Sequence, residues 1–363
     1  MRRICSSVSA STGTPSVQVL TLSGNIVWVG ANVAGRTIMW SRFATGQGKV
    51  GLLKATVSRY ARRMTPRRAP FPLSLTGPVG IFDSGVGGLS VWREIARALP
   101  GESTVYMADQ AHVPYGPRAA PEIRRFCDGI TDWLLTQGCK AVVVACNTAS
   151  AAALRHLRER CPGVPFVGME PAVKPAAALT RTGVVGIMAT PATFQGRLFQ
   201  ATAGRHAADI RLVNQVCDGL AEAVERGDTS GLESEALVRR FVDPMLQAGA
   251  DVIVLACTHY PFVIDLVRRI AGPHVTVIDP APAIARQLAR VLETAGPVGL
   301  PAAGARHRFV TSGNAAAFGA ALRTLAGVAA PVESIRWRHV DAQWELGEAA
   351  TASTTHDRPT ATG

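Results

Sequence analysis

Two short stretches of the chain, AVVVACNTAS at residues 141–150 and DVIVLACTHY at residues 251–260, share one pattern. Each is a run of small and β-branched apolar residues that ends on Ala-Cys, with a threonine soon after and a helical pattern beyond. An apolar run of this length predicts a strand buried on both faces, as in a parallel sheet. The pattern therefore puts Cys146 and Cys257 at the carboxyl ends of two buried strands, where open α/β sheets bind their ligands.

Either cysteine alone is compatible with a small buried apolar residue, because unpaired cysteines are among the most buried residue types. The matching contexts favour a chemical role instead: one thiol precedes Asn147-Thr148 and the other precedes Thr258-His259. A thiol at such a position can act as a nucleophile, a base or a metal ligand.

The bulk composition predicts a globular protein. A chain of 363 residues, 47% of them hydrophobic, is expected to form two domains rather than one. No apolar run approaches the roughly 18 residues of a membrane helix, so we expect a soluble protein without membrane contact. The seven cysteines include no Cys-x-x-Cys pair, which argues against a disulfide framework or a zinc knuckle and for the reducing cytoplasm.

The net charge of +12 is concentrated at the N-terminus. Residues 1–77 hold 11 of the 38 Lys and Arg residues and no acidic residue, whereas residues 78–363 hold 27 basic and 26 acidic residues. Because the rest of the chain is nearly neutral, the charge does not indicate a nucleic-acid partner.

Residues 1–77 show no sustained helical or strand period. We expect a disordered extension or a misassigned start, with Met64 as the true beginning. The Arg-rich, Ser-rich and acid-poor composition is also compatible with an organellar transit peptide. A secretory signal fits poorly, because serines interrupt the apolar stretch after Arg2-Arg3.

From residue 78 onward, predicted strands alternate with helices, which favours parallel sheets. The two cysteine strands fall in successive repeats of this alternation. We therefore expect an α/β fold of two similar parallel-sheet domains that face each other across a central cleft, with one thiol on each wall.

A glycine-rich turn, DSGVGG at residues 83–88, joins the first predicted strand to a helix. Its glycines match neither a dinucleotide-binding pattern nor a Walker loop, so nucleotide binding is only weakly indicated. The glycines are better explained by positive φ angles and by a close approach of the backbone to a small group. Asp83 could hold an ammonium group, orient a catalytic residue, or only cap the helix that follows.

Thiols on opposite walls suit a reaction that removes a proton from one face of a carbon atom and returns one to the other. Asp83, Glu225 and His259 are candidates for groups that adjust the acidity of the thiols. Two other functions remain open. A Cys–His hydrolase would use Cys257 as nucleophile but leaves residues 141–150 without a role. A small-molecule-binding protein with structural thiols leaves the polar neighbours unexplained.

Five motifs resemble those of the glutamate racemases, which belong to the cofactor-independent aspartate/glutamate racemase family. They are, in order, GIFDSGVGGLSV (80–91), PYG (114–116), VACNTAS (144–150), GMEPAVKPA (168–176) and ACTHYP (256–261). Ser150 and His259 favour the glutamate members over the aspartate members. The sequence of residues 107–112 differs from the one that is more common in the family at that loop.

The resemblance implies that Cys146 and Cys257 are the acid/base cysteines of a racemase that needs no cofactor or metal. It implies that Cys257 takes the proton from L-glutamate and that Cys146 takes it from D-glutamate. Glu225 matches an acidic residue near the second thiol. The implied catalytic and substrate-binding residues also include four adjacent pairs: Asp83-Ser84, Tyr115-Gly116, Asn147-Thr148 and Thr258-His259.

The resemblance also implies a cellular context and a domain layout. The partners would be L- and D-glutamate, with D-glutamate used for peptidoglycan; a homodimer and activation by a cell-wall precursor are left open. One lobe would comprise residues 78–173 and 280–345 and carry Cys146, and the other would comprise residues 174–279 and carry Cys257. We expect the Ala/Thr-rich residues 346–363 to form a disordered tail.

Overall fold

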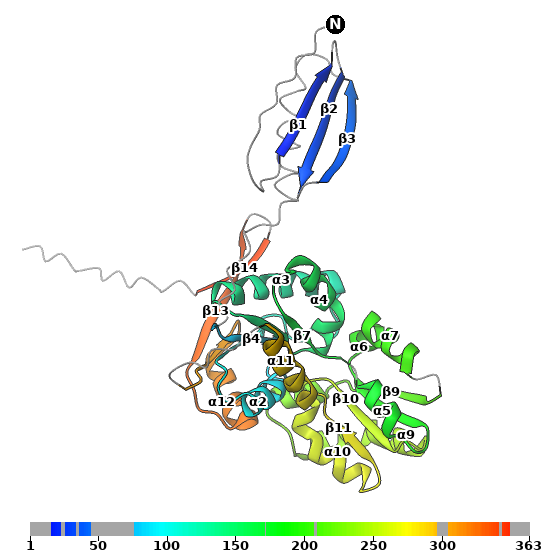
Figure 1. Ribbon diagram of the computed structural model, residues 1–363. Coiled ribbons are helices and arrows are strands. Elements are labelled where there is room, and N and C mark those ends of the chain that lie inside the picture. Colours follow the sequence, from blue (N-terminus) through cyan, green and yellow to red (C-terminus); the bar gives the residue numbers. More distant parts are fainter. Residues whose placement is uncertain are drawn as a thin grey trace, which may run out of the picture. The chain divides into compact units, whose positions relative to one another are not determined.

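The computed structural model describes residues 76–348, apart from residues 171, 207–208, 296–303 and 341–342, together with three strands nearer the N-terminus. The chain divides into two compact units, residues 1–71 and residues 72–363 (Figure 1).

The N-terminal unit contains an antiparallel sheet of order β1-β2-β3, formed by β1 (Ser16–Leu22), β2 (Ile26–Val33) and β3 (Arg36–Ala44). The prediction of a wholly disordered segment over residues 1–77 is therefore wrong for these strands. Their sequences are rich in β-branched and aromatic residues, and the connections between them are two or three residues long and contain glycine, which suits hairpins. The rest of residues 1–75 lies outside the described residues.

The larger unit contains a seven-stranded sheet of order β14-β13-β12-β5-β4-β6-β7, parallel except for its last pair, β13 and β14. β4, β5 and β6 are buried along their whole length because helices cover both faces, which explains their continuous apolar sequences. The strands are β4 (Val79–Asp83), β5 (Thr104–Ala108), β6 (Ala141–Val144), β7 (Phe166–Gly168), β12 (His307–Thr311), β13 (Val332–Val340) and β14 (Gln343–Glu348).

A second, four-stranded parallel sheet has the order β11-β10-β8-β9. Its strands are β8 (Val184–Ala189), β9 (Arg211–Val216), β10 (Val252–Ala256) and β11 (Thr276–Ile278). Two parallel-dominated sheets in alternation with helices confirm the predicted α/β fold. The strands of residues 174–279 all belong to this sheet, and the remaining strands of residues 78–345 belong to the larger one.

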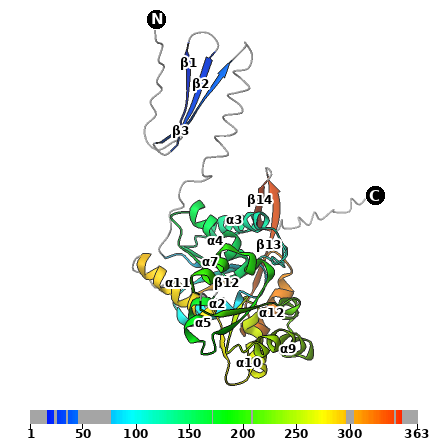
Figure 2. The ribbon, with the colours of Figure 1, turned by 90° about the vertical axis from the view of Figure 1, so that its right-hand side faces the viewer.

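Helices follow most strands and cover the sheets (Figure 2). α2 packs against both α11 and α12. In the part of the chain that forms the second sheet, α9 packs against α10. Among the described residues, none of the helices combines the length and the hydropathy that a membrane span requires. The helices are α2 (Leu89–Ala98), α3 (Ala120–Thr136), α4 (Asn147–Arg160), α5 (Val173–Leu179), α6 (Pro191–Gln195), α7 (Arg197–His206), α8 (Leu220–Glu225), α9 (Leu232–Gln247), the 3₁₀ helix η1 (Tyr260–Val263), α10 (Ile264–Ala271), α11 (Ala281–Ala295) and α12 (Ala315–Ala326).

The two sheets share a repeated topology. The first has β5-β4-β6-β7 and the second has β9-β8-β10-β11, so in both the spatial order is second, first, third and fourth strand of the repeat. The chain order reverses between the first and third strands, which is where sheets of this kind leave a crevice at their carboxyl ends. Cys146 and Cys257 both follow the third strand, so they occupy equivalent positions in the two repeats.

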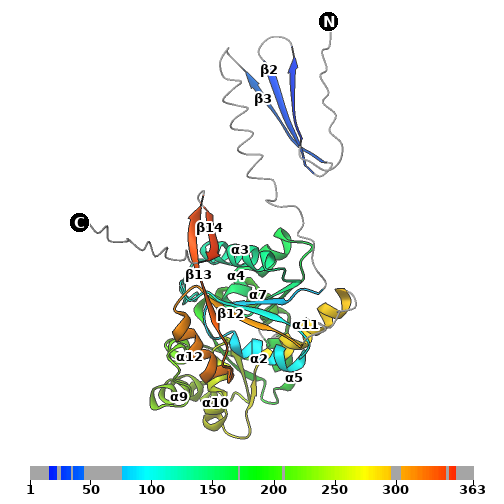
Figure 3. The same cartoon turned by 90° about the vertical axis from the view of Figure 1, so that its left-hand side faces the viewer.

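The C-terminal end of the fold differs from the prediction. β13 and β14 follow β12 and extend the large sheet alongside α3 (Figure 3). The disordered tail cannot begin at residue 346, because β14 continues to Glu348. This strand pairs with β13 in an antiparallel hairpin, which the composition of the segment does not reveal. Residues 349–363 lie outside the described residues.

Candidate active site

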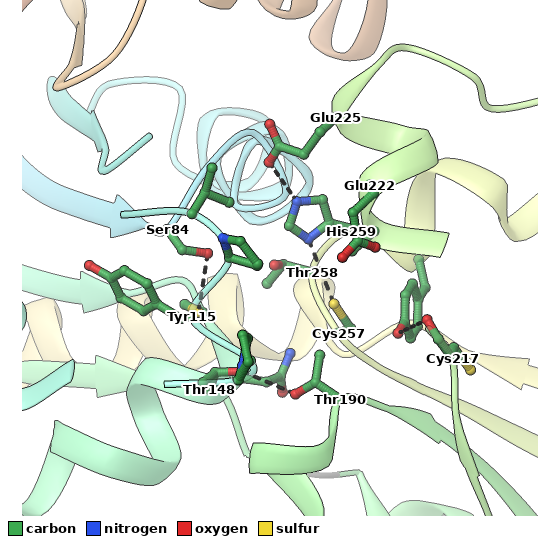
Figure 4. Close-up of a pocket in the computed structure, with 18 of the residues that line it drawn as sticks. Ser84, Tyr115, Thr148, Thr190, Cys217, Glu222, Glu225, Cys257, Thr258 and His259 are labelled. Carbon is green, nitrogen blue, oxygen red and sulfur yellow. Dashed lines mark hydrogen bonds and ion pairs between the residues drawn. The ribbon is translucent and has the colours of Figure 1, made fainter. Parts of the chain in front are cut away.

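A cavity of about 470 Å³ lies between the two sheets and is lined by residues from both. The larger sheet supplies the segments that follow β4, β5 and β6, and the smaller sheet supplies those that follow β8, β9 and β10, together with α8. Figure 4 shows these side chains converging on the cavity. The carboxyl ends of both sheets therefore form the walls of one site.

Cys146 lines the cavity at the N-terminus of α4. Its backbone is extended, and its Sγ accepts a hydrogen bond from the backbone N–H of Ala149 at 3.4 Å. Ser84 Oγ lies 3.9 Å from the same sulfur. Burial raises the pKa of the Cys146 thiol well above its usual value, and the charge of Asp83 raises it further. These surroundings favour the protonated thiol.

Asp83 lies beside Cys146 but does not line the cavity, and it is fully buried. Its Oδ2 accepts the backbone N–H of Gly88 at 2.7 Å, and Ser84 Oγ lies 3.4 Å from its Oδ1. Burial raises the pKa of Asp83, although the charge of His259 opposes that shift. Of the roles considered for Asp83, this geometry favours orienting the thiol and closing the turn before α2.

Cys257 lines the other wall as part of a chain of three side chains. His259 Nδ1 lies 3.7 Å from Cys257 Sγ, and His259 Nε2 lies 2.8 Å from Oε1 of Glu225. Burial alone would lower the pKa of His259, but the hydrogen bonds to Cys257 and Glu225 outweigh it and raise that pKa well above its usual value. The pKa of Glu225 is lowered: burial opposes this, but the hydrogen bond and charge of His259 prevail. These two contacts therefore favour the charged form of the imidazole next to Cys257.

The glycine-rich turn lies against this second wall. The backbone N–H of Val86 donates to Oε1 of Glu225 at 2.8 Å. A Cβ atom on Gly87 would lie 2.5 Å from His259 Nδ1, and one on Gly85 would overlap the Glu225 carboxylate. The predicted close approach is therefore present, but the groups approached are side chains of the other lobe. The predicted positive φ angles are absent from Gly85, Gly87 and Gly88.

All the other substrate-binding residues indicated by the sequence line the cavity; they are Ser84, Tyr115, Gly116, Asn147, Thr148 and Thr258. Asn147 is the most informative of them, because it is buried and neither its Oδ1 nor its Nδ2 has a hydrogen-bond partner in the part of the chain that the structure describes. A buried amide normally has partners, so this one indicates that a polar ligand occupies the cavity.

The model of the Asp/Glu/hydantoin racemase family matches residues 79–288, which include both cysteines and both walls of the cavity. The chain belongs to this family. The resemblance noted in the sequence is thereby confirmed.

Curated members of the family are close in sequence. Glutamate racemase from Pseudomonas aeruginosa strain PAO1 is 54% identical over 214 residues, which cover 59% of this chain and 81% of that protein. Glutamate racemase from Roseiflexus sp. strain RS-1 is 51% identical over 219 residues, which cover 60% of this chain and 80% of that protein.

Solved structures of the family share the fold. Glutamate racemase isoform RacE1 from Bacillus anthracis superposes with a TM-score of 0.66 at 31% identity, covering 72% of this chain and 98% of that one. The Escherichia coli glutamate racemase, solved with L-glutamate and the activator UDP-MurNAc-ala, has a TM-score of 0.61 at 31% identity, covering 68% of this chain and 94% of that one.

The site of this family member contains residues that the sequence did not single out, notably Thr190, Cys217 and Arg226. Thr190 Oγ1 lies 3.1 Å from Thr148 Oγ1 and so connects the two lobes across the cavity. Thr190 follows β8 and Cys217 follows β9, the equivalents of β4 and β5. The repeat that relates the two cysteine strands also relates the strands beside them. The sequence could therefore have indicated Thr190 and Cys217 as site residues.

Proposed function

We propose that this chain interconverts L- and D-glutamate by two-thiol acid/base catalysis without a cofactor, and so supplies D-glutamate for peptidoglycan. The observation that carries the proposal is the equivalent position of Cys146 and Cys257, which follow matching strands and line the same cavity from different lobes. The relatives named glutamate racemase support the substrate.

The proposed reaction transfers two protons. The thiolate of Cys257 accepts the proton from Cα of L-glutamate, and the electron pair of the broken C–H bond passes into the adjacent carboxylate. The S–H group of Cys146 then donates its proton to the opposite face of Cα, which gives D-glutamate. The reverse reaction uses the same groups in exchanged roles, and proton exchange with solvent restores either resting form.

The electrostatics of the two walls support this direction of transfer. The imidazole of His259, whose charged form its contacts favour, lies against Cys257 Sγ and can stabilise the negative charge that develops on that sulfur during the reaction. Among the described residues no such cation lies beside Cys146, and the charge of Asp83 next to it favours the protonated thiol. The His259 ring beside Cys257 and the Asp83 carboxylate beside Cys146 therefore give the two thiols different surroundings, as a reaction that pairs a base with an acid requires.

The remaining residues are proposed to bind the substrate. Asn147, with two unpaired buried groups, and the hydroxyls of Thr148 and Thr258 can hydrogen-bond the carboxylates of glutamate. Tyr115 and Gly116 contribute the wall that follows β5. Asp83 is proposed to position Cys146 instead of contacting the ammonium group. Homodimer formation and activation by a cell-wall precursor stay predictions of the resemblance.

Circular dichroism on purified protein in the presence of EDTA tests the proposal. L-glutamate should lose its optical activity, whereas L-aspartate should react far more slowly, because a shorter chain leaves buried polar groups of the site unpaired. Comparable rates on both would indicate a broader racemase. No loss from either would contradict racemisation and return attention to a Cys–His hydrolase.

A further inference from the structure

Asp109 follows β5 and is a fully buried carboxylate that accepts hydrogen bonds from four side chains. Its Oδ1 accepts from Ser312 Oγ and from Trp337 Nε1, each at 2.7 Å. Its Oδ2 accepts from Tyr115 OH at 2.7 Å and lies 2.9 Å from His112 Nδ1. A buried carboxylate requires such partners, and these come from three separate parts of the chain.

One of the partners faces the active site, and another comes from the C-terminal strands. Tyr115 lines the cavity, as Figure 4 shows, whereas Trp337 lies on β13, 228 residues from Asp109 along the chain. The Trp337 ring also meets the ring of His112 edge-on, with centroids 5.2 Å apart. His112 in turn stacks on Phe126 of α3 at 3.8 Å. The strand β13 therefore contacts the loop that carries Tyr115.

We propose that Trp337 is a positioning residue for the reaction, acting through Asp109 on Tyr115. The proposal rests on the function proposed above. The indole N–H and Ser312 hold Oδ1, which fixes the rotation of the carboxylate and directs Oδ2 at the Tyr115 hydroxyl. Without the indole N–H, Ser312 is the one donor to Oδ1 that remains among the described side chains, and the carboxylate can rotate away from Tyr115.

The effect should fall on substrate binding, because Tyr115 and Gly116 form part of the cavity wall whereas both thiols lie on other segments. Trp337→Phe removes the N–H and keeps an aromatic ring. We expect KM for glutamate to rise about tenfold, the scale of a hydrogen bond to a charged group, with kcat changed less than about twofold.

Trp92→Phe is the matched control. Trp92 is buried whereas Trp337 is partly buried, and Trp92 Nε1 likewise donates a hydrogen bond, to Thr104 Oγ1 at 2.9 Å, but Trp92 does not line the cavity. Its replacement removes a comparable hydrogen bond and should leave both KM and kcat within about twofold of the parent values. A rise in KM that is equal in the two variants would indicate a general loss of stability and overturn the proposal.

A double-mutant cycle with Tyr115→Phe separates positioning from general destabilisation. Since Trp337 is proposed to act through the Tyr115 hydroxyl, Trp337→Phe should raise KM by less than about twofold when that hydroxyl is absent. If the two substitutions raise KM independently, so that their effects multiply in the double variant, the proposal is overturned. An unchanged KM in the single Trp337→Phe variant would overturn it as well.

If Trp337→Phe does not fold, Ser312→Ala removes the other donor to Oδ1 and is judged by the same outcomes. Failure of the parent protein to racemise glutamate would instead contradict the proposed function.

Discussion

Glu225 Oε1 lies 2.8 Å from His259 Nε2 and accepts, at the same distance, the backbone N–H of Val86 from the opposite lobe. One carboxylate oxygen thus holds the histidine beside Cys257 and also connects the two lobes. The charge state of His259 and the closure of the cavity consequently depend on the same residue.

Replacing Glu225 by Gln should lower the pKa of His259, because the carboxylate is one of the two groups that raise it. If catalysis needs the imidazolium, activity falls as the pH rises through the pKa of His259, and in Glu225→Gln this alkaline limb moves to lower pH. The pH profile of kcat/KM measures the shift. Glu235→Gln, on α9 outside the cavity, should leave the limb unchanged. A limb that does not move in Glu225→Gln would exclude His259 as the controlling group.

The same pair should contribute to stability over a limited pH window. The contribution of Glu225, whose pKa is lowered, is present above about pH 4.5 and is lost as the pH falls through its folded-state value. The contribution of His259, whose pKa is raised, is complete below about pH 6.5 and is lost as the pH rises through its folded-state value. The decrease in Tm caused by Glu225→Gln should therefore be greatest near pH 5 to 6 and should shrink towards either extreme.

Gly87→Ala should reduce activity by about a hundredfold, because the added methyl group must displace His259 or the turn and small misplacements of catalytic groups have effects of that size. Thermal unfolding should still be cooperative. Gly204→Ala is the matched control: Gly204 lies in α7, where an added Cβ would meet nothing within 4 Å, so activity should be unchanged. Full activity in Gly87→Ala would mean that the close contact with His259 does not matter.

A chain that starts at Pro72 should be soluble and should racemise glutamate at the rate of the full-length protein. Residues 72–363 form a compact unit of their own, and the family match lies within residues 79–288. Solubility, Tm and turnover of the shortened protein are the measurements. An insoluble or inactive product would show that the N-terminal sheet contributes to the fold or the reaction.

Much of the fold follows from local sequence. The apolar runs of β6 and β10 and the polar residues after them predict buried parallel strands with ligands at their ends, and both cysteines line the cavity as this pattern requires. The bond between Glu225 and His259 could not be predicted in the same way, because it depends on how two segments 34 residues apart pack. The same holds for Trp337 and Asp109, which meet only when β13 joins the large sheet.

The two cysteines provide the matched test of the mechanism. Cys146→Ala and Cys257→Ala should each lose racemisation in both directions by about a thousandfold or more, since each direction needs both a base and an acid. Cys127→Ala, at a fully buried position of α3 outside the cavity, should lower stability and leave turnover intact. Substantial two-way racemisation in either of the first two variants, with the protein folded, would show that the equivalent strands have no shared catalytic role.

The most direct test of the two-thiol mechanism is the fate of hydrogen in deuterium oxide. A thiol exchanges its proton with solvent, so the hydrogen donated to Cα comes from water, whereas the proton removed goes to the other sulfur. Early in the reaction from L-glutamate, mass spectrometry or proton NMR should find deuterium at Cα of the D-glutamate formed and almost none in the L-glutamate that remains. Label appearing equally in both enantiomers, or product that keeps the original hydrogen, would indicate a single base and contradict the account.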